Sequence, residues 1–296
     1  MWNTWTDQKV TRYERDVPRD PESGIIREAE PRELGPIDTG KAILMVHGFV
    51  GSPNNFNDLP DRVAASGWHV RVMLLPGHGT SPRTFETTSA AELEQAVMNE
   101  LEALREGFST VVLMGHSMGG ALATLAAAQC PVDGLILASP YYAVTHRWYY
   151  GLRPETWARI LTPAVRWVYH SPKRQPVNRR ESSERIVSYP WIPTAGIRTA
   201  ITLAAAARES RVTAGITMPT LLIHSRKDSV TDPAMSEKVF NSFPVSKKTV
   251  VWLHRSDHII FWDYDDKQVI DEVLSFLETI NALDCPARQR NRGLLP

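Results

Sequence analysis

The strongest constraint on the fold is an alternation of short apolar runs with helical patterns through most of the chain. Six of these runs are short and apolar enough to be predicted as buried strands. They are residues 42–46, 70–75, 111–114, 135–138, 221–223 and 250–253. Buried strands that alternate with helices are typical of a mostly parallel sheet with helices on both faces. The sequence therefore predicts an α/β fold.

Two predicted helices have recognisable ends or apolar stripes. Ser89 and Glu92 form a capping box at the start of one helix, which Gly107 is expected to end. A second amphipathic helix is predicted near the C-terminus, over residues 269–280. The tail beyond it, residues 283–296, contains proline and several arginines and is expected to be disordered.

One long segment, residues 141–213, interrupts the alternation. It has no strand-like run but several helical stretches, ten tyrosines and tryptophans, and 12 basic against 4 acidic side chains. Its net charge is therefore about +8, and the rest of the chain balances it to a total of zero. We expect an insertion into one domain, whose core is residues 41–140 and 214–282 and whose N-terminal extension is residues 1–40.

Composition excludes several classes of protein. The chain of 296 residues has 33 basic and 33 acidic side chains, which argues against nucleic-acid binding through a globally basic surface. No run approaches the roughly 18 apolar residues of a membrane span, and the first 20 residues lack an apolar signal core. Cys130 and Cys285 are too far apart in sequence for a CxxC site. We expect a soluble protein of a reducing compartment, the cytoplasm, with a removed N-terminal signal or anchor as the alternative.

Residues Gly115-His116-Ser117-Met118-Gly119 match the nucleophile-elbow pattern G-x-S-x-G. The pattern follows the predicted strand 111–114 directly and opens an alanine-rich helix. A sharp strand-to-helix turn forces its central residue into a strained backbone conformation, and flanking glycines leave room for it. We therefore predict that Ser117 is a nucleophile. The alternative is a glycine-serine turn with no chemical role.

A serine hydroxyl is a weak nucleophile until a base takes its proton. His258 is the preferred base because it follows the last predicted strand by a short loop and comes after the other candidate groups. His254, at the end of that strand, is the alternative. His116 is expected to point away from Ser117. Four further histidines are expected to be surface or packing residues: His69, His146, His170 and His224.

The carboxylate that orients the base should lie between Ser117 and His258 in sequence. Asp228 and Asp232 both follow the predicted strand 221–223. Asp232 precedes a proline and a helical stretch, so a helix N-cap accounts for it. Asp228 has no such explanation and sits where α/β sheets place their sites, so it is preferred.

The transition state of acyl transfer also needs two hydrogen-bond donors for its oxyanion. The predicted strand 42–46 runs into His47-Gly48-Phe49-Val50-Gly51, a turn that can aim a backbone N–H inward. We predict that the donors are Phe49 N–H and Met118 N–H. The alternative explanation for residues 47–51 is a tight turn that leads into the helix near residues 59–65. The chain needs that turn in either case, so it does not exclude the donor role.

Five groups of residues together resemble the α/β-hydrolase superfamily, most closely bacterial carboxylesterases and monoacylglycerol lipases, over about residues 40–282. These are His47-Gly48-Phe49, Leu75-Pro76-Gly77-His78-Gly79, Gly115-His116-Ser117-Met118-Gly119-Gly120, Asp228 with Val230 and Pro233, and Asp257-His258. The resemblance implies Ser117 as nucleophile, His258 as base and Asp228 as its orienter, with Phe49 and Met118 as oxyanion donors. It also places residues 141–213 where the family has its cap, or lid.

The chain departs from the family at two positions. Ser225 stands where glycine is usual before the acid loop, and Asp257 stands where glycine often precedes the histidine. Neither change removes a catalytic group, but Asp257 places a second carboxylate beside the base. Further candidates for the substrate site are His47, Gly48, His116, Tyr141 and Trp148.

The predicted function is hydrolysis of carboxylic esters through an acyl-enzyme, with no cofactor and no metal. Thioesterase, amidase or peptidase, and C–C bond hydrolase activities are alternatives on the same residues, and a non-catalytic binding protein is the remaining one. The expected partner is a small ester or lipid, with no nucleic acid; the oligomeric state is not predicted. Four arginines of the insertion could face anionic lipid or pair with acidic residues elsewhere: Arg147, Arg153, Arg159 and Arg166.

Overall fold

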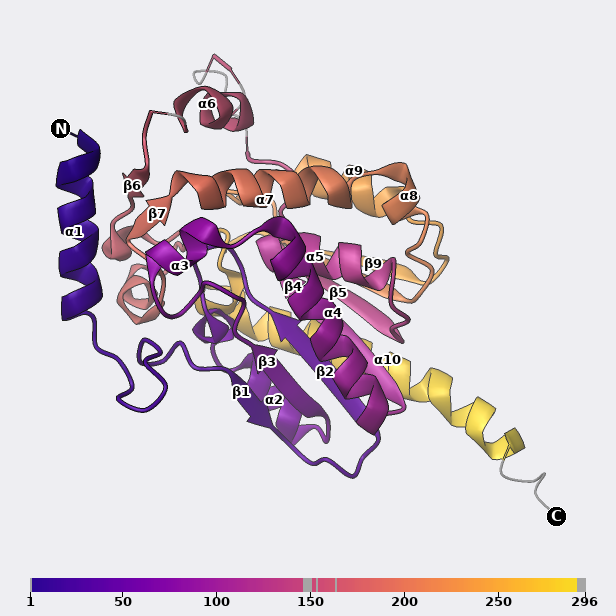
Figure 1. Cartoon of the computed structure of the whole chain (residues 1–296). Coiled ribbons are helices and arrows are strands. Elements are labelled where there is room, and N and C mark those ends of the chain that lie inside the picture. Colours follow the sequence, from indigo (N-terminus) through magenta and orange to yellow (C-terminus); the bar gives the residue numbers. More distant parts are fainter. Residues whose placement is uncertain (1, 146–150, 153, 163, 292–296) are drawn as a thin grey trace.

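A seven-stranded sheet runs through the middle of the molecule in the computed structural model, which describes residues 2–145, 151–152, 154–162 and 164–291 (Figure 1). The strand order is β1-β3-β2-β4-β5-β8-β9, and every neighbouring pair is parallel except β1 with β3. The strands are β1 Arg32–Leu34, β2 Lys41–Val46, β3 His69–Met73, β4 Thr110–His116, β5 Gly134–Ala138, β8 Thr220–Ser225 and β9 Lys248–Leu253.

Helices cover both faces of this sheet because alternate side chains of each strand point to opposite sides. In β2, Leu44 and Val46 belong to the core under one helical layer, whereas Ile43 and Met45 belong to the core under the other. The first layer contains α4 Ala90–Gly107, α5 Met118–Ala127 and α9 Pro233–Asn241, and the second contains α2 Leu59–Ala65 and α10 Asp266–Asn291. The mostly parallel α/β fold predicted from the sequence is confirmed.

The six predicted strands and the two predicted helices are all present. Ser89 caps α4 through the expected box, and Gly107 is its last residue. The edge strand β1 is an addition, since three residues are too short to show a periodic pattern. Helix α10 extends to Asn291, so the described part of the stretch expected to be disordered is helical, and residues 292–296 lie outside the described residues.

The insertion contains strands, contrary to the expectation that it would not. β6 Trp167–Tyr169 and β7 Trp191–Pro193 pair antiparallel as a small ribbon. The sequence did not reveal them because each has three residues and its partner lies more than 20 residues away. The helical elements of the insertion are α6 Pro154–Leu161, η3 Pro172–Arg174, η4 Arg180–Arg185, α7 Thr194–Ala207 and α8 Ser210–Thr213.

The N-terminal extension also forms a helix that was not predicted, α1 Trp2–Asp16. Figure 1 shows α1 at the outer edge of the molecule beside β6, while α7 crosses above the sheet and packs on α5 and on α3 Pro82–Thr87. Two short 3-10 helices complete the chain, η1 Pro53–Phe56 and η5 Ile260–Trp262. Within the ranges that the structure describes, no helix is long and apolar enough to cross a membrane.

The parallel strands β2, β4, β8 and β9 end at the same edge of the sheet. The loops that follow them therefore converge, as is general for ligand sites in open α/β sheets. Those four loops carry Phe49, Ser117, Asp228 and His258. The topology alone thus brings together groups that are far apart in the sequence.

Candidate active site

Ser117 lies at a sharp turn between β4 and α5, with φ 55° and ψ −120°. A positive φ costs an L-residue free energy, so the surrounding structure must hold it there. The flanking glycines allow the tight passage: a Cβ at position 115 would lie 2.1 Å from the Gly119 carbonyl oxygen. A Cβ at position 119 would lie 2.1 Å from the Val46 carbonyl oxygen. The structure therefore has the elbow conformation that the G-x-S-x-G pattern predicted.

Ser117, His258 and Asp228 form a hydrogen-bonded chain. Ser117 Oγ lies 2.9 Å from His258 Nε2, and His258 Nδ1 lies 2.8 Å from Asp228 Oδ2. All three side chains are buried, and His258 comes from the loop after β9 while Asp228 comes from the loop after β8. Because a carboxylate only accepts, His258 carries its proton on Nδ1, which leaves Nε2 free to accept from the serine hydroxyl.

Asp228 is held ionised by several donors. Its Oδ1 accepts from Val230 N–H and Thr231 N–H at 2.8 Å each, and its Oδ2 also accepts from Thr231 Oγ1 at 2.9 Å. Burial raises the pKa of Asp228, but attraction to His258 and hydrogen bonds from His224 and His258 outweigh burial. The pKa therefore lies well below the usual range of an aspartate, and the side chain is a carboxylate at neutral pH.

His224 was expected to be a surface or packing histidine, and the structure instead places it on the same carboxylate. It is fully buried at the end of β8, and its Nε2 lies 3.0 Å from Asp228 Oδ2. His224 and Asp228 are four residues apart, but the end of a strand lies between them, so no helical or strand periodicity in the sequence predicted this contact. Asp228 Oδ2 consequently contacts two imidazoles from opposite sides of the acid loop.

The neighbouring carboxylates have other partners. Asp232 accepts from Ala234 N–H at 2.9 Å and caps α9, with Pro233 in the first turn. Asp257 accepts from Ser229 N–H at 2.7 Å and from Ser229 Oγ at 2.9 Å, while burial raises its pKa. His254, the alternative base, is exposed. The geometry thus brings Asp228, and not Asp232, to His258.

The turn after β2 lies against the serine. A Cβ at position 48 would meet Ser117 Cβ at 3.0 Å, a tight contact that glycine avoids. Phe49 follows on the same loop and Met118 is the first residue of α5, where backbone N–H groups have no partner within the helix. The two predicted oxyanion donors therefore belong to backbone segments on either side of Ser117.

His47 has a structural role in this turn. It is fully buried, its Nε2 accepts from Leu75 N–H at 3.1 Å, and its Nδ1 lies 2.9 Å from the Gly48 carbonyl oxygen. Burial holds the pKa of His47 well below its ordinary value. His47 therefore fixes the loop and does not line the pocket around Ser117, in contrast to its place among the predicted substrate-site residues.

A pocket of about 250 Å³ opens above Ser117 and His258. His116, one of the candidates for the substrate site, is among its walls, and its Nε2 lies 3.2 Å from the His258 carbonyl oxygen. The other walls are Gly48, Phe49, Val50, Gly51, Asn55, His170, Gln175, Pro176, Ser188, Ile192, Val230 and Ile259. Tyr141 is buried outside these walls, and Trp148 lies outside the described residues.

The insertion contributes five of these walls, and the sequence identified none of them. They are His170, Gln175, Pro176, Ser188 and Ile192. His258 N–H donates to the Pro176 carbonyl oxygen at 3.1 Å, so the insertion also fixes the backbone of the candidate base. The many aromatic residues of the insertion favoured Tyr141 and Trp148 instead. Composition does not show which residues of a short loop face a cavity.

Of the four arginines singled out in the insertion, Arg166 is the one whose side chain the structure describes, and it is paired. Arg166 forms two hydrogen bonds to Glu86, at 2.6 and 2.7 Å, and a third to Asp7 at 3.0 Å. Arg166 therefore pairs with acidic residues outside the insertion, which was the alternative to lipid binding. Arg147 and Arg153 lie outside the described residues, as does the side chain of Arg159.

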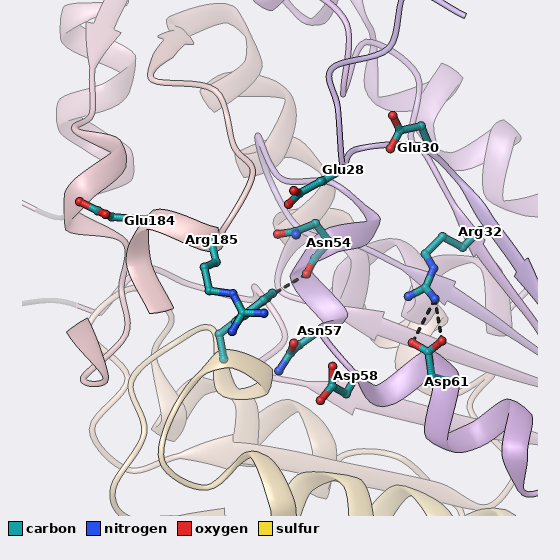
Figure 2. Close-up of a pocket in the computed structure, with 10 residues that line it drawn as sticks. Glu28, Glu30, Arg32, Asn54, Asn57, Asp58, Asp61, Glu184 and Arg185 are labelled. Atoms are coloured by element: carbon teal, nitrogen blue, oxygen red, sulfur yellow. Dashed lines mark hydrogen bonds and ion pairs between the residues drawn. The ribbon is translucent and has the colours of Figure 1, made fainter. Parts of the chain in front are cut away.

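A larger pocket, of about 670 Å³, lies elsewhere on the surface (Figure 2). Figure 2 shows mostly carboxylates and amides around it, including Arg32 paired with Asp61 at 2.8 Å. It contains no serine, histidine or cysteine among its walls. Among the described residues, no group of three or more His, Cys, Asp or Glu side chains could hold a metal ion. Size alone therefore does not identify the chemical site.

Comparisons with known proteins agree with this geometry. A model of the family described as serine aminopeptidase S33 matches residues 38–265. A thermostable monoacylglycerol lipase from Bacillus sp. (strain H-257) is 26% identical over 261 residues, 85% of this chain and 95% of the relative. A carboxylesterase from Bacillus subtilis (strain 168) is 21% identical over 243 residues, 81% of this chain and 94% of the relative.

Solved structures show the same fold. A structure from a study of two metagenome-derived lipolytic enzymes is similar with a TM-score of 0.75 and 26% identity, and covers 86% of this chain and 99% of its own. The monoacylglycerol lipase of Paleococcus ferrophilus gives a TM-score of 0.70 at 22% identity, over 85% of this chain and 98% of its own.

Proposed function

Because this chain belongs to the serine aminopeptidase S33 family of α/β-hydrolases, we propose that it is a serine hydrolase that cleaves carboxylic esters. The observation that carries the proposal is the chain from Ser117 through His258 to Asp228, set at the floor of a pocket. Nucleophile, base and orienting group lie within hydrogen-bond distance of one another, as acyl transfer requires.

In the first step, Ser117 Oγ attacks the ester carbonyl carbon while His258 Nε2 takes the hydroxyl proton. The imidazolium formed is stabilised by Asp228, which stays ionised and keeps the ring in one tautomer. The carbonyl oxygen becomes an oxyanion, for which Phe49 N–H and Met118 N–H are the proposed donors. The N-terminus of α5 adds a favourable partial positive charge at the same place.

The tetrahedral intermediate then collapses to an acyl-enzyme. His258 gives its proton to the departing alkoxide oxygen, and the alcohol leaves. A water molecule next attacks the acyl carbon, again giving a proton to His258 Nε2, and the second intermediate releases the acid and restores the Ser117 hydroxyl. Each proton that leaves an attacking oxygen returns to a leaving oxygen, so the enzyme ends each cycle in its starting state.

The pocket walls favour an ester over a free peptide N-terminus. Val50, Ile192, Val230 and Ile259 supply apolar surface, and none of the pocket's described walls is an aspartate or glutamate. An aminopeptidase needs a group to bind a positively charged amine, and a carboxylate is the usual one. A pocket of about 250 Å³ suits an acyl chain of short or medium length. The names of the lipase and carboxylesterase relatives agree with this substrate class.

The test compares substrates at equal concentration. We expect hydrolysis of p-nitrophenyl esters and monoacylglycerols, with a maximum at short or medium acyl length, and little release from amino-acid p-nitroanilides. An organophosphonate should label Ser117 stoichiometrically, and Ser117→Ala should remain unlabelled. Label on another serine, with Ser117 unmodified in an active enzyme, would refute the assignment. If the protein cleaved the amino-acid p-nitroanilides faster than the esters, it would be a peptidase and not an esterase.

A further inference from the structure

Helix α1 presents two different faces to its surroundings. Val10 and Thr6 are fully buried, and Val10 packs against Trp167 and Trp191 of the β6–β7 ribbon. The neighbouring stripe, one step around the helix, is exposed or half-buried and runs Trp2, Trp5, Lys9, Arg12 and Asp16. Figure 1 shows this helix at the outer edge of the molecule, so the second stripe faces outward.

Charge is segregated between these faces. The acidic residues Asp7 and Glu14 face the body of the protein, where Arg83 pairs with both at 3.0 and 3.1 Å. Asp16 pairs with the adjacent Arg15 at 2.8 Å. Among the ion pairs of the described residues, none includes Lys9 or Arg12. The outward stripe is therefore cationic.

The same stripe joins an aromatic surface on the ribbon. Trp2 and Trp5 have ring centroids 5.4 Å apart, Trp5 and Trp191 6.5 Å, and Tyr169 and Trp191 5.0 Å. Trp2 is 59% exposed, Trp5 47% and Tyr169 57%. With Lys9 and Arg12 these side chains line a shallow groove of about 650 Å³. We call Trp2, Trp5, Tyr169 and Trp191, with Lys9 and Arg12, the aromatic patch.

We propose that the aromatic patch docks the protein on an anionic lipid surface. Tryptophan and tyrosine favour the boundary between lipid and water because their rings are apolar while their N–H and O–H groups stay hydrated. Lysine and arginine beside them are attracted to anionic headgroups. A helix with tryptophans and cations on one exposed face is the usual form of such an anchor. The family model begins at residue 38, so α1 lies outside the part that the family shares.

A second copy of the chain fits this patch less well. In a two-fold contact the same surface meets itself, which would bring Lys9 and Arg12 of one copy near those of the other. Asp16, the one carboxylate among the groove walls, is already paired with Arg15. Like charges would therefore oppose the contact, whereas an anionic surface attracts them.

The ribbon connects the aromatic patch to the candidate active site. Along β7, Trp191 lines the groove of the aromatic patch and the next residue, Ile192, lines the pocket above Ser117. Beside it, Tyr169 lines the groove and His170 lines the pocket. Alternate side chains of a strand point to opposite faces, so the ribbon separates the two sites by its own thickness. Docking would therefore hold the pocket near the lipid surface.

The test measures binding by flotation with vesicles, using the full chain with Ser117→Ala so that no lipid is consumed. We expect binding to vesicles containing phosphatidylglycerol, weaker binding to pure phosphatidylcholine, and a loss of at least roughly ten-fold for Trp2→Ala/Trp5→Ala. Lys9→Gln/Arg12→Gln should weaken binding roughly ten-fold at low salt and change little at ~0.5 M salt. Ile37→Ala, which removes an exposed apolar side chain outside the aromatic patch, is the matched control.

Three results would overturn the proposal. The first is that the protein does not bind anionic vesicles, and the second is that the Trp2→Ala/Trp5→Ala variant binds them as well as the parent protein does. The third concerns Ile160 on α6, an apolar side chain that is 54% exposed: it is loss of binding with Ile160→Ser and not with the tryptophan variant. Sedimentation of the free protein adds a fourth, a dimer that the tryptophan variant abolishes. Folding of each variant is checked by circular dichroism and thermal unfolding. Binding is measured without hydrolysis, so its outcome is independent of the proposed esterase activity.

Discussion

The loops at the carboxyl edge of the sheet and the insertion, residues 141–213, meet at one pocket but are held by different interactions. The loop that carries Asp228 is held by contacts within a few residues, since Asp228 accepts from Val230 N–H and Thr231 N–H. The insertion is held by contacts across the chain: the Tyr189 hydroxyl donates to the Gly77 carbonyl oxygen and accepts from Thr80 N–H. Nearby residues therefore hold the candidate acid, whereas the shape of the pocket depends on packing between segments that are far apart in the sequence.

This difference separates the expected effects of substitution. A change in the loops should alter kcat with little change in substrate preference, because those residues act on the reacting atoms. A change in the insertion should alter which acyl chain binds, because His170 and Ile192 form walls of the pocket. The predictions below test that division, from the largest expected effect to the smallest.

Ser117→Ala should lower kcat by roughly 10⁵-fold or more, since removal of the nucleophile leaves only binding and oxyanion stabilisation. The melting temperature should change little or rise, because alanine removes no packed side chain. Steady-state kinetics and thermal unfolding of the same preparation measure both. His254→Ala, a change to an exposed histidine after the same strand as His258, is the control and should keep nearly full activity.

Asp228→Asn should lower kcat about 10⁴-fold, because an amide cannot hold His258 in the required tautomer with the same charge. The matched variant Asp232→Ala removes the α9 cap and should lower the free energy of unfolding by about 1 kcal/mol with kcat nearly intact. Kinetics and urea unfolding distinguish the two. If Asp232→Ala proved the inactive protein and Asp228→Asn the active one, the acid would have been assigned to the wrong residue.

Acid should destabilise the loop side of the pocket through three buried histidines. Burial lowers the pKa of His78 to about 4 and of His116 to about 3, and that of His47 well below its ordinary value. The unfolded chain takes up protons below about pH 6.5 and the folded chain does not, so stability falls as pH falls from about 6.5 toward 4. The slope is at most about 1.4 kcal/mol per pH unit for each histidine.

Urea unfolding between about pH 7 and pH 4.5 measures this slope, and His78→Gln should reduce it. His170, on the insertion side of the pocket, serves as the comparison because it is exposed, although burial lowers its pKa as well. His170→Gln should reduce the slope less than His78→Gln does. An equal reduction by both variants would mean that the two sides of the pocket do not differ in this respect.

His224→Leu should lower kcat by about ten-fold with KM nearly unchanged, because Asp228 Oδ2 loses a donor that fixes its position. His224 touches the carboxylate and not the pocket, so it acts by positioning. Thr231→Val removes the neighbouring donor to the same oxygen and should give an effect of similar size. A rise in KM at constant kcat, for either variant, would contradict this role.

Ile192→Ala should change the preferred acyl length with only a few-fold change in kcat for the best short ester, because it widens one pocket wall. The ratio of kcat/KM for a long and a short p-nitrophenyl ester measures the change. Val168→Ala is the matched control, since Val168 pairs with Ile192 across the ribbon but is 41% exposed and is not a wall. Equal shifts in the two variants would place specificity elsewhere.

The sequence predicted the parts of the site that depend on local geometry. A glycine-flanked serine after the third apolar run, an aspartate after the fifth and a histidine after the last one are local signals, and the structure brings all three together. His224 gave no such signal because four residues across a strand end form no periodic pattern, and Pro176 gave none because its contact with His258 depends on where separate loops meet. The strands β6 and β7 were missed for the same reason, since three-residue segments are defined by their pairing and not by their own pattern.

The crowding around the elbow sets limits on how such a protein can diversify. At positions 115 and 119 a single added methyl group would collide with backbone at 2.1 Å, and at position 48 it would lie 3.0 Å from Ser117 Cβ, a tight contact. A mutant library spread over these glycines would consist almost wholly of inactive clones. A library over Ile192, Ser188 and His170 meets no such barrier. Substitutions in the insertion can therefore change which ester the protein accepts, while the residues around Ser117 and the reaction they support stay the same.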